Sequence, residues 1–308
     1  MAFDPADYRN GITLAGGDFL TELDEKIGHT SDLPEQANVE HSEQVRDIAE
    51  AFVQTGASIL ATYTDGANAV VLADLIEAGD IDAPSIMAIN HAGAALCRAA
   101  MAKRPGSKGQ VLGSMGPVEQ LLSLDEIDET ALFDAYREQG VALAEGGADA
   151  ILCRSFTEIE AMVVAVRAAI DGTGLPVIGS LIFDSGPEYN ETAMGVSVPQ
   201  ACATLEDAGA SMVGCDRNEY PDGTAAIVTL LRQSCDLPIW VEINAGRAEI
   251  HEDRVVYPST PKEFAESFRP IAEAGAGVIG GGWGVTVAHI AEMARSRERY
   301  LSRARLRK

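Results

Sequence analysis

Charged side chains that follow short apolar runs are the residues with which this sequence could do chemistry. Asp216 and Glu242 each come shortly after such a run, where a carboxylate could act as general acid or base or neutralise a cationic group. Arg154 and Arg217 have equivalent positions and could bind a carboxylate, sulfonate or phosphate through paired N–H donors. These residue types indicate a site for a small charged molecule, with the two carboxylates as candidate catalytic groups.

Two aromatic residues and three polar ones have the same kind of position. Trp283 follows three glycines and Tyr63 follows another apolar run, so either ring could cover a sulfonium or quaternary ammonium centre. Asp18, Ser114 and Asn244 complete the set of candidate substrate-binding residues.

Several of these residues also have a purely structural explanation. The neighbours Asp216 and Arg217 could form an ion pair with each other, and Trp283 could fill the space that the glycines leave. Asn244 precedes Ala-Gly and could simply set a turn, and Cys215 could be inert packing. The sequence leaves both kinds of explanation open.

The elements that carry these residues follow one repeated pattern. A Gly- or Pro-marked start, a short apolar run, a polar or Gly-rich end and a helical segment recur eight times. Strands that alternate with helices predict a parallel sheet that is buried on both faces, and eight units in 308 residues predict a (β/α)8 TIM barrel. An open doubly wound sheet is the alternative, although the first Gly-rich turn lacks the GxGxxG spacing of a dinucleotide site. The predicted strands are 11–15, 57–61, 110–112, 148–152, 176–182, 210–213, 238–241 and 276–279.

A barrel would bring the candidate residues together, because the carboxyl ends of its strands share one mouth. Between the strands, apolar residues at helical spacing predict helices over 43–55, 126–145, 158–169, 198–208, 224–234 and 261–274. Residues 28–40 show little periodicity, which predicts a loop near the mouth. A single domain over residues 1–308 is the simplest organisation, with 295–308 as a basic helix end or tail.

The charge of the chain limits its partners. The formal net charge is −24, although residues 295–308 hold seven basic residues and one acid. An acidic surface argues against nucleic acid and anionic membranes, which leaves a small-molecule substrate. The basic end complements the dipole of a terminal helix, and a contact with an acidic neighbouring subunit in a homo-oligomer is the alternative.

Other features of the composition point to a cytoplasmic protein. No apolar stretch reaches about 18 residues, so we expect no membrane-spanning helix. Residues 1–10 lack a basic-then-apolar signal pattern. Five cysteines without a CxxC pair predict neither a disulfide framework nor a zinc ribbon.

The order and spacing of several motifs resemble the homocysteine S-methyltransferase family. Gly113-Ser114-Met115-Gly116-Pro117 is similar to the family's Gly-Ser-Ile-Gly-Pro, and Asn244-Ala245-Gly246 to the end of its Pro-Asn-Ala-Gly. The segment Ala61-Thr62-Tyr63-Thr64-Asp65-Gly66-Ala67-Asn68 looks like its Thr-Asn-Thr-Phe-Gly-Ala-Asn. The resemblance covers roughly Gly11 to Met293 and implies a TIM barrel of the kind found in betaine–homocysteine and cobalamin-dependent methyltransferases.

The sequence departs from this family where the family does its chemistry. The family binds zinc through an adjacent cysteine pair and a third cysteine, and the matching places here hold Gly282, Trp283 and Arg217. The family's Glu-Thr after the fourth strand, which helps to hold homocysteine, is Arg154-Ser155 here. We therefore expect no zinc of the family type and predict no other cofactor, although Cys215 leaves a shifted ligand conceivable.

The resemblance implies a divergent methyltransferase that moves a methyl group involving a small anionic or zwitterionic substrate, without the family zinc. One alternative is a different enzyme on the same barrel, such as a lyase or hydrolase. The other alternative is a non-catalytic relative that binds a small molecule. The many ionisable residues at the predicted mouth argue against this second alternative.

Overall fold

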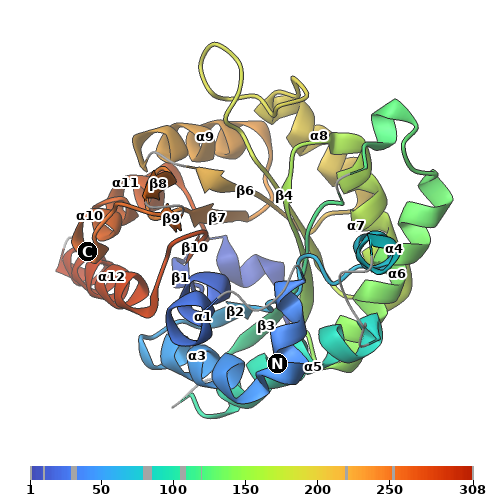
Figure 1. The fold of residues 1–308 in the computed structure, drawn as a ribbon. Helices are drawn as coiled ribbons and strands as arrows, with labels where there is room; N and C mark the ends of the chain where they lie inside the picture. Colours follow the sequence, from blue (N-terminus) through green and yellow to red (C-terminus); the bar gives the residue numbers. More distant parts are fainter. Residues whose placement is uncertain are drawn as a thin grey trace.

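Eight parallel strands form a barrel that is surrounded by helices (Figure 1). The computed structural model describes residues 2–9, 11–28, 33–78, 85–104, 109–118, 120–218, 221–251 and 254–306. Hydrogen-bonded neighbours follow the order β1-β10-β7-β6-β5-β4-β3-β2, and a bridge from Ala15 to Ile59 joins the two ends. The predicted (β/α)8 fold and all eight predicted strands are confirmed. The barrel strands are β1 (Thr13–Leu14), β2 (Ile59–Ala61), β3 (Gln110–Met115), β4 (Ala150–Phe156), β5 (Val177–Leu181), β6 (Met212–Asn218), β7 (Ile239–Ile243) and β10 (Val278–Gly281).

Alternation of side chains along the strands divides the core into two layers. Inside the barrel, residues such as Leu112, Ile178 and Trp240 pack together with no exposed surface. Tyr8, at the end of the 3-10 helix η1 (Pro5–Tyr8), joins this cluster and lies against Gly277 just before β10. The N-terminal segment therefore covers the amino-terminal end of the barrel, and the opposite end carries the mouth.

The outer layer consists of helices that pack on the outward-facing strand residues. Those that match predicted ranges are α3 (Ser42–Gln54), α6 (Glu129–Glu145), α7 (Ile159–Thr173), α8 (Val198–Ala208), α9 (Pro221–Ser234), and the pair α10 (Pro261–Glu266) and α11 (Phe268–Ala274). The predicted helix 261–274 is split because Pro270, in the first turn of α11, has no N–H and disfavours a continuous helix. The described residues of the basic segment belong to α12 (Val287–Leu306).

The structure corrects several gaps in the sequence-based prediction. Helices α1 (Phe19–Ile27), α4 (Ala69–Ala78) and α5 (Ile86–Ala102) were not predicted, the last because alanines leave little contrast between its faces. In the predicted loop 28–40, residues 33–40 include the 3-10 helix η2 (Pro34–Gln36) and α2 (Ala37–Glu40), whereas residues 29–32 lie outside the described residues. A two-stranded hairpin, β8 (Glu249–His251) with β9 (Arg254–Val256), was also missed, as was the short 3-10 helix η3 (Leu122–Leu124).

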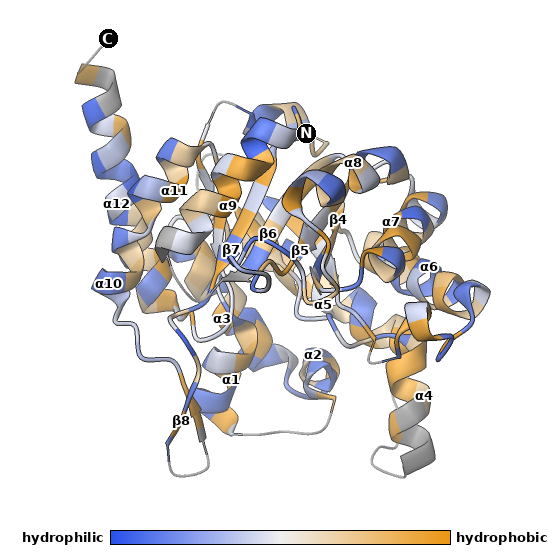
Figure 2. Cartoon of the chain, turned by 90° about the horizontal axis from the view of Figure 1, so that it is seen from above, coloured by the Kyte–Doolittle hydropathy of each residue, from blue (hydrophilic) through white to orange (hydrophobic). Residues whose placement is uncertain are grey.

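Different segments of the chain lie at the two ends of the barrel (Figure 2). The hairpin β8–β9, α1, α2 and α4 project on the mouth side, whereas the N-terminus and the end of α12 lie on the other side. Among the described helices, none has the length and apolar character needed to cross a membrane.

Candidate active site

An arginine held by two carboxylates lies at the centre of the mouth. Arg154, on β4, donates from Nε to Asp65 Oδ1 at 2.8 Å and from Nη2 to Asp65 Oδ2 at 2.6 Å. Its Nη1 donates to Glu242 Oε1, on β7, at 2.9 Å, and Ser114 Oγ on β3 donates to Asp65 Oδ1 at 2.5 Å. Four side chains from separate strand ends thus form one cluster, which is the convergence that a barrel predicts.

Among its described side chains, this cluster has two carboxylates and one cation. The Arg154 guanidinium faces two carboxylates, and attraction to Asp65 and Glu242 outweighs burial and raises its pKa. Burial raises the pKa of Glu242, whose side chain is only 4% exposed, while Arg154 acts in the opposite direction. A further positive group beside Glu242 would therefore be stabilised, because it would offset the desolvation of the carboxylate.

Asp216 lies next to this cluster, and one of its partners is a serine on β4. Ser155 Oγ donates to Asp216 Oδ2 at 2.9 Å, and both side chains are buried. Ser155 has φ of 68°, a left-handed conformation that costs a residue with a Cβ about 1 kcal/mol or more. The pairing of β4 with β5 is also irregular between Cys153 and Phe156. This local distortion gives Ser155 the geometry with which it holds the Asp216 carboxylate.

The turn after β10 is tied to its surroundings by two polar side chains. Asn244 Oδ1 accepts from the backbone N–H of Trp283 at 2.9 Å, so Asn244 does more than set its own turn. Asp18 caps the N-terminus of α1 by accepting from Leu20 and Thr21, and it also accepts from the N–H of Gly284 at 3.4 Å. Both predicted residues therefore position the glycine-rich loop.

Tyr63 is placed differently from the prediction, and Cys215 takes the structural position that the sequence left open. Tyr63 is not on the surface of the mouth: it is 6% exposed and stacks on Phe19 at 6.1 Å, because α1 covers the end of β2. Cys215 is fully buried in the layer between strands and helices and does not face into the barrel. The side chain of Arg217 lies outside the described residues. Trp283, in contrast, is 40% exposed at the mouth.

Glu35 is a buried acid near the mouth that sequence reasoning missed. It lies on η2, is 6% exposed, and its Oε1 accepts from the N–H of Gly66 at 2.7 Å. Burial raises the pKa of Glu35 to about 7, and the Gly66 N–H opposes that shift. No periodic signal in residues 28–40 marks this carboxylate, and only the contact with the turn after β2 shows where it lies.

Two of the three residues at the family's zinc positions, Gly282 and Trp283, supply no zinc ligand, and the side chain of the third, Arg217, lies outside the described residues. Gly282 has no side chain, and a Cβ added there would lie 2.5 Å from Asn244 Oδ1. Trp283 offers an indole rather than a thiolate. Within the described part of the chain, no group of three His, Cys, Asp or Glu side chains has the arrangement of a metal site. The residues present therefore do not fit the zinc that the resemblance implies.

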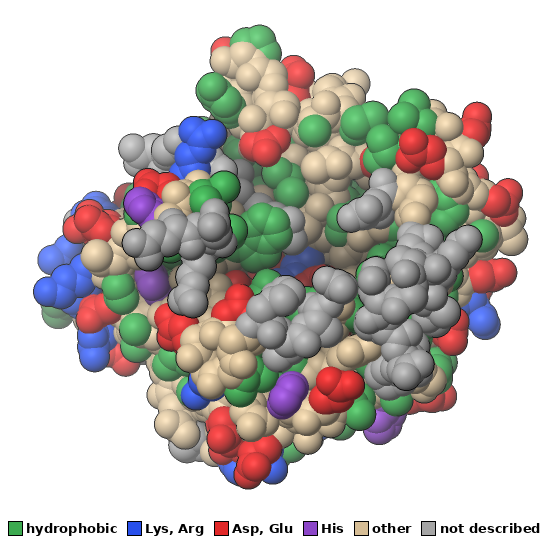
Figure 3. Space-filling view, in the orientation of Figure 1, with side chains coloured by type: hydrophobic (Ala, Val, Ile, Leu, Met, Phe, Trp, Pro, Cys, Tyr) green, Lys and Arg blue, Asp and Glu red, His purple; other side chains and the backbone are tan. Residues whose placement is uncertain are grey.

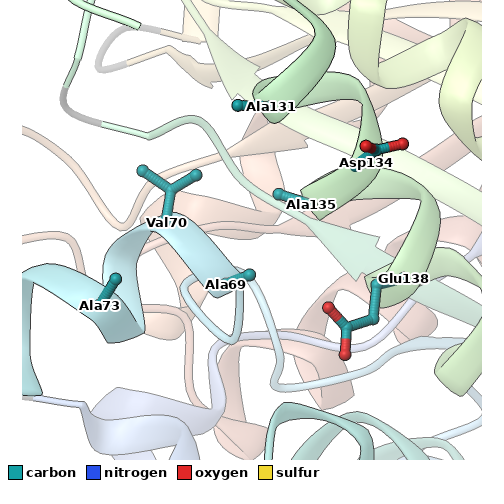
Figure 4. Close-up of a pocket in the computed structure, with 7 residues that line it drawn as sticks. All are labelled: Ala69, Val70, Ala73, Ala131, Asp134, Ala135 and Glu138. Carbon is teal, nitrogen blue, oxygen red and sulfur yellow. The ribbon is translucent and has the colours of Figure 1, made fainter. Parts of the chain in front are cut away.

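The shape of the surface agrees with a site at the mouth. Seen from this side, the molecule is hollowed at its centre, with charged side chains at the base and hydrophobic ones on the rim (Figure 3). A second hollow of about 380 Å³ lies between α4 and α6 (Figure 4). Most of the residues that line it are alanines, and Asp134 and Glu138 are its charged lining residues. Its lining lacks the paired cation and carboxylates found at the mouth.

Comparison with known proteins gives a consistent result. The profile of the homocysteine S-methyltransferase family matches residues 13–297. Methionine synthase of Mycobacterium tuberculosis is 31% identical over 252 residues, which is 79% of this chain and 20% of that protein. Betaine–homocysteine S-methyltransferase 1 of Sus scrofa is 27% identical over 226 residues, which is 72% of this chain and 76% of that protein. The chain thus spans about a fifth of the methionine synthase that it matches.

Solved structures support the fold. The metallated form of the homocysteine methyltransferase MmuM from Escherichia coli superposes with a TM-score of 0.76 at 21% identity, covering 93% of this chain and 96% of that one. The carboxyl transferase domain of Rhizobium etli pyruvate carboxylase matches more loosely, with a TM-score of 0.54 and 13% identity over 96% of this chain and 48% of that one.

Proposed function

Because this chain belongs to the homocysteine S-methyltransferase family, we propose that it is a methyltransferase whose site is the cluster of Asp65, Ser114, Arg154 and Glu242 at the barrel mouth, together with the neighbouring Asp216. The observation that carries the proposal is the contact of Arg154 with both Asp65 and Glu242. Arg154 and the two carboxylates that it contacts come from three strand ends, and among their described side chains two carboxylates face one guanidinium. The relatives whose names specify homocysteine supply the reaction class, and the charges in this chain suggest the ligand.

We propose a zwitterionic ligand rather than a simple anion. From the sequence we expected the Arg154 guanidinium to be available for a ligand. In the structure its Nε, Nη1 and Nη2 each donate to a carboxylate of the protein. The remaining N–H groups could still orient a ligand carboxylate. The cationic centre of the ligand would face Asp216 and Glu242, and the half-exposed Trp283 would cover its methyl-bearing atom.

Methyl transfer then requires one displacement and one proton transfer. The acceptor's lone pair attacks the methyl carbon, and the bond from that carbon to the donor atom breaks with its electron pair moving to the donor. The proton of the acceptor moves to a carboxylate, for which Glu242 is the candidate because burial raises its pKa. Alignment of two bound reactants would supply much of the rate enhancement.

We further propose that this reaction proceeds without the family zinc. Asn244 Oδ1 fills the place that a side chain at Gly282 would need, and Trp283 is held by the same oxygen. Elemental analysis of protein purified without chelator should find far less than one zinc per chain. Stoichiometric zinc would contradict this part of the proposal and would restore ordinary homocysteine activation as the leading mechanism.

The activity is tested by incubating the protein with donors that carry a labelled methyl group. The donors should include betaine and a sulfonium compound, and the acceptors should include homocysteine and non-thiol compounds. Mass spectrometry should detect an acceptor that has gained the label. Turnover without methyl transfer would favour a lyase or hydrolase on this barrel, and binding without turnover would favour a non-catalytic relative.

A further inference from the structure

Two cysteines of neighbouring outer helices lie in contact with each other. Cys202 is on α8, and Cys235 directly follows α9, the helix that packs against α8 (Figure 1). Their side chains form a hydrogen bond with each other, and both are free thiols. Because the two sulfurs already touch, a covalent bond of about 2.05 Å between them needs no large movement of either helix.

The two thiols differ in their access to solvent. Cys202 is 1% exposed and belongs to the core between strands and helices, whereas Cys235 is half-buried at the edge of that core. The other three cysteines, Cys97, Cys153 and Cys215, are buried in the same core. A small reagent from solvent therefore reaches Cys235 first and meets Cys202 as its direct neighbour.

The surroundings of Cys235 favour its thiolate. Arg232, in the last turn of α9, donates from Nη1 to the carbonyl of Leu237 at 3.0 Å and from Nη2 to the carbonyl of Cys235, which holds the guanidinium beside the thiol. The hydrogen bond from Cys202 has the largest effect and lowers the pKa of Cys235 to about 7, against the opposing effect of burial. The Leu237 N–H and Arg232 also lower this pKa, and Glu206 on α8 raises it. The thiolate is the form of cysteine that attacks an oxidant.

We propose that Cys235 and Cys202 form a reversible disulfide between α9 and α8 when the protein meets a hydroperoxide. An accessible thiolate next to a second, resolving thiol is the arrangement of a redox-sensitive cysteine pair. Such a bond is compatible with a protein whose cysteines are otherwise reduced, because it forms only on exposure to the oxidant.

The reaction has two steps. The Cys235 thiolate attacks the terminal oxygen of the hydroperoxide, the O–O bond breaks, and the leaving alkoxide takes a proton from solvent, which leaves a sulfenic acid on Cys235. The sulfur of Cys202 then attacks the sulfenic sulfur, the S–O bond breaks, and the hydroxide leaves as water with the proton of the Cys202 thiol. Two thiols are thereby oxidised to a disulfide, and the hydroperoxide is reduced to an alcohol and water.

The pair lies away from the proposed methyl-transfer site. Cys235 shortly precedes the start of β7 at Ile239, which places it at the amino-terminal end of the barrel, opposite the mouth. The inference therefore goes beyond the proposed function and holds whether or not the protein transfers methyl groups. Because β6 lies between the two cysteines in the chain, the disulfide would close a loop around this strand and restrain the unfolded chain.

The first test uses mass spectrometry on the unmodified full chain. The protein is treated with hydrogen peroxide, denatured and alkylated with N-ethylmaleimide. We expect the loss of two hydrogen atoms, two fewer alkylated thiols and a linked pair of peptides that carry Cys202 and Cys235, and dithiothreitol should restore both thiols. Two free thiols after treatment, an oxidised Cys235 beside a free Cys202, or a bond between two copies of the chain would each overturn the proposal.

The second test removes the resolving thiol. In Cys202→Ser, peroxide should give a sulfenic acid on Cys235 that dimedone traps, and no disulfide. Cys97→Ser is the matched control, because Cys97 is also 1% exposed, and this variant should still form the disulfide. A disulfide in the Cys202 variant would contradict the assignment of the pair. The first test decides the proposal even if a variant fails to fold.

The third test identifies the attacking thiol. Native protein is alkylated with iodoacetamide over a range of pH, and the rate of Cys235 labelling should rise through a midpoint near pH 7 rather than 9. Arg232→Met should move this midpoint upward, because the guanidinium no longer favours the thiolate. A midpoint near 9 in the unmodified protein would overturn the attacking role of Cys235. None of these readouts uses methyl transfer, so their failure would leave the proposed reaction untouched.

Discussion

Arg154 and Asp65 form two parallel hydrogen bonds across the barrel mouth, with Nε–Oδ1 and Nη2–Oδ2 distances of 2.8 and 2.6 Å. This paired geometry fixes the plane of the guanidinium, and Glu242 then holds its third nitrogen. Eighty-eight residues of chain or more separate these partners, and only closure of the barrel brings them together.

Replacing Asp65 by Asn should disturb the position of Arg154 without emptying the site. The amide cannot accept two charged hydrogen bonds, so we expect a loss of roughly 2 kcal/mol in the free energy of unfolding. We also expect at least a tenfold loss in kcat/KM for methyl transfer. The exposed Asp184→Asn, at the end of another strand, is the control and should leave both quantities unchanged.

Replacing Arg154 by Met tests the ligand-orienting role of the guanidinium. We expect KM for the zwitterionic substrate to rise tenfold or more, which corresponds to about 1.4 kcal/mol of lost binding. Steady-state kinetics provide the measurement. Arg137→Met, which removes an exposed arginine paired with Asp171, is the matched control. An unchanged KM for the Arg154 variant would exclude this role.

The packing at Gly282 predicts that a side chain there is not tolerated unless Asn244 yields. Gly282→Cys should lower Tm because its Cβ would meet Asn244 Oδ1 at 2.5 Å, and it should not bring zinc into the protein. Adding Asn244→Gly should recover part of the loss. Gly11→Ala, where an added Cβ meets nothing closer than 4.0 Å, is the control for the loss of a glycine.

The buried carboxyl of Glu35 predicts a pH-dependent contribution to stability. Its folded-state pKa of about 7 exceeds the ordinary 4.5, so the folded protein binds this proton more tightly than the unfolded chain. The stability that it contributes is therefore present below pH 4.5 and is lost as pH rises toward 7. Glu35→Gln should abolish this part of the pH dependence and stabilise the protein at pH 8 relative to the wild type. Denaturant unfolding across this range measures it, with the exposed Glu40→Gln as control.

We expect the buried hydroxyl of Tyr63 to contribute nothing to the stability of the protein. Tyr63 Oη is buried without a hydrogen-bond partner among the described residues, so Tyr63→Phe should leave Tm unchanged or raise it. Tyr136→Phe is the contrast, because Tyr136 Oη donates to the carbonyl of Gly116 at 3.1 Å, and its loss should cost about 1 kcal/mol. Strongly reduced turnover in the Tyr63 variant would show that this hydroxyl acts in the site after all.

The barrel and the residues at the carboxyl ends of its strands could be predicted from the sequence alone. Each buried parallel strand needs a continuous apolar run, and each run is followed by a polar turn and a helix. Each of the eight units can therefore be recognised from a short segment of the sequence. Strand ends such as those with Arg154, Asp216 and Glu242 could therefore be named before any contact was known. Helices with alanine on every side, such as α5, carry no such local contrast and were missed.

The contacts among these residues could not be predicted without the folded structure. Hydrogen bonds depend on the positions of the donor and acceptor atoms to within tenths of an ångström. The amino-acid sequence does not state those positions. The irregular pairing at Cys153–Phe156 accompanies the pairing of Ser155 with Asp216, and α1 covers Tyr63. Charge balance at the mouth was decided in the same way, because Arg154 meets two carboxylates that lie far from it in the chain.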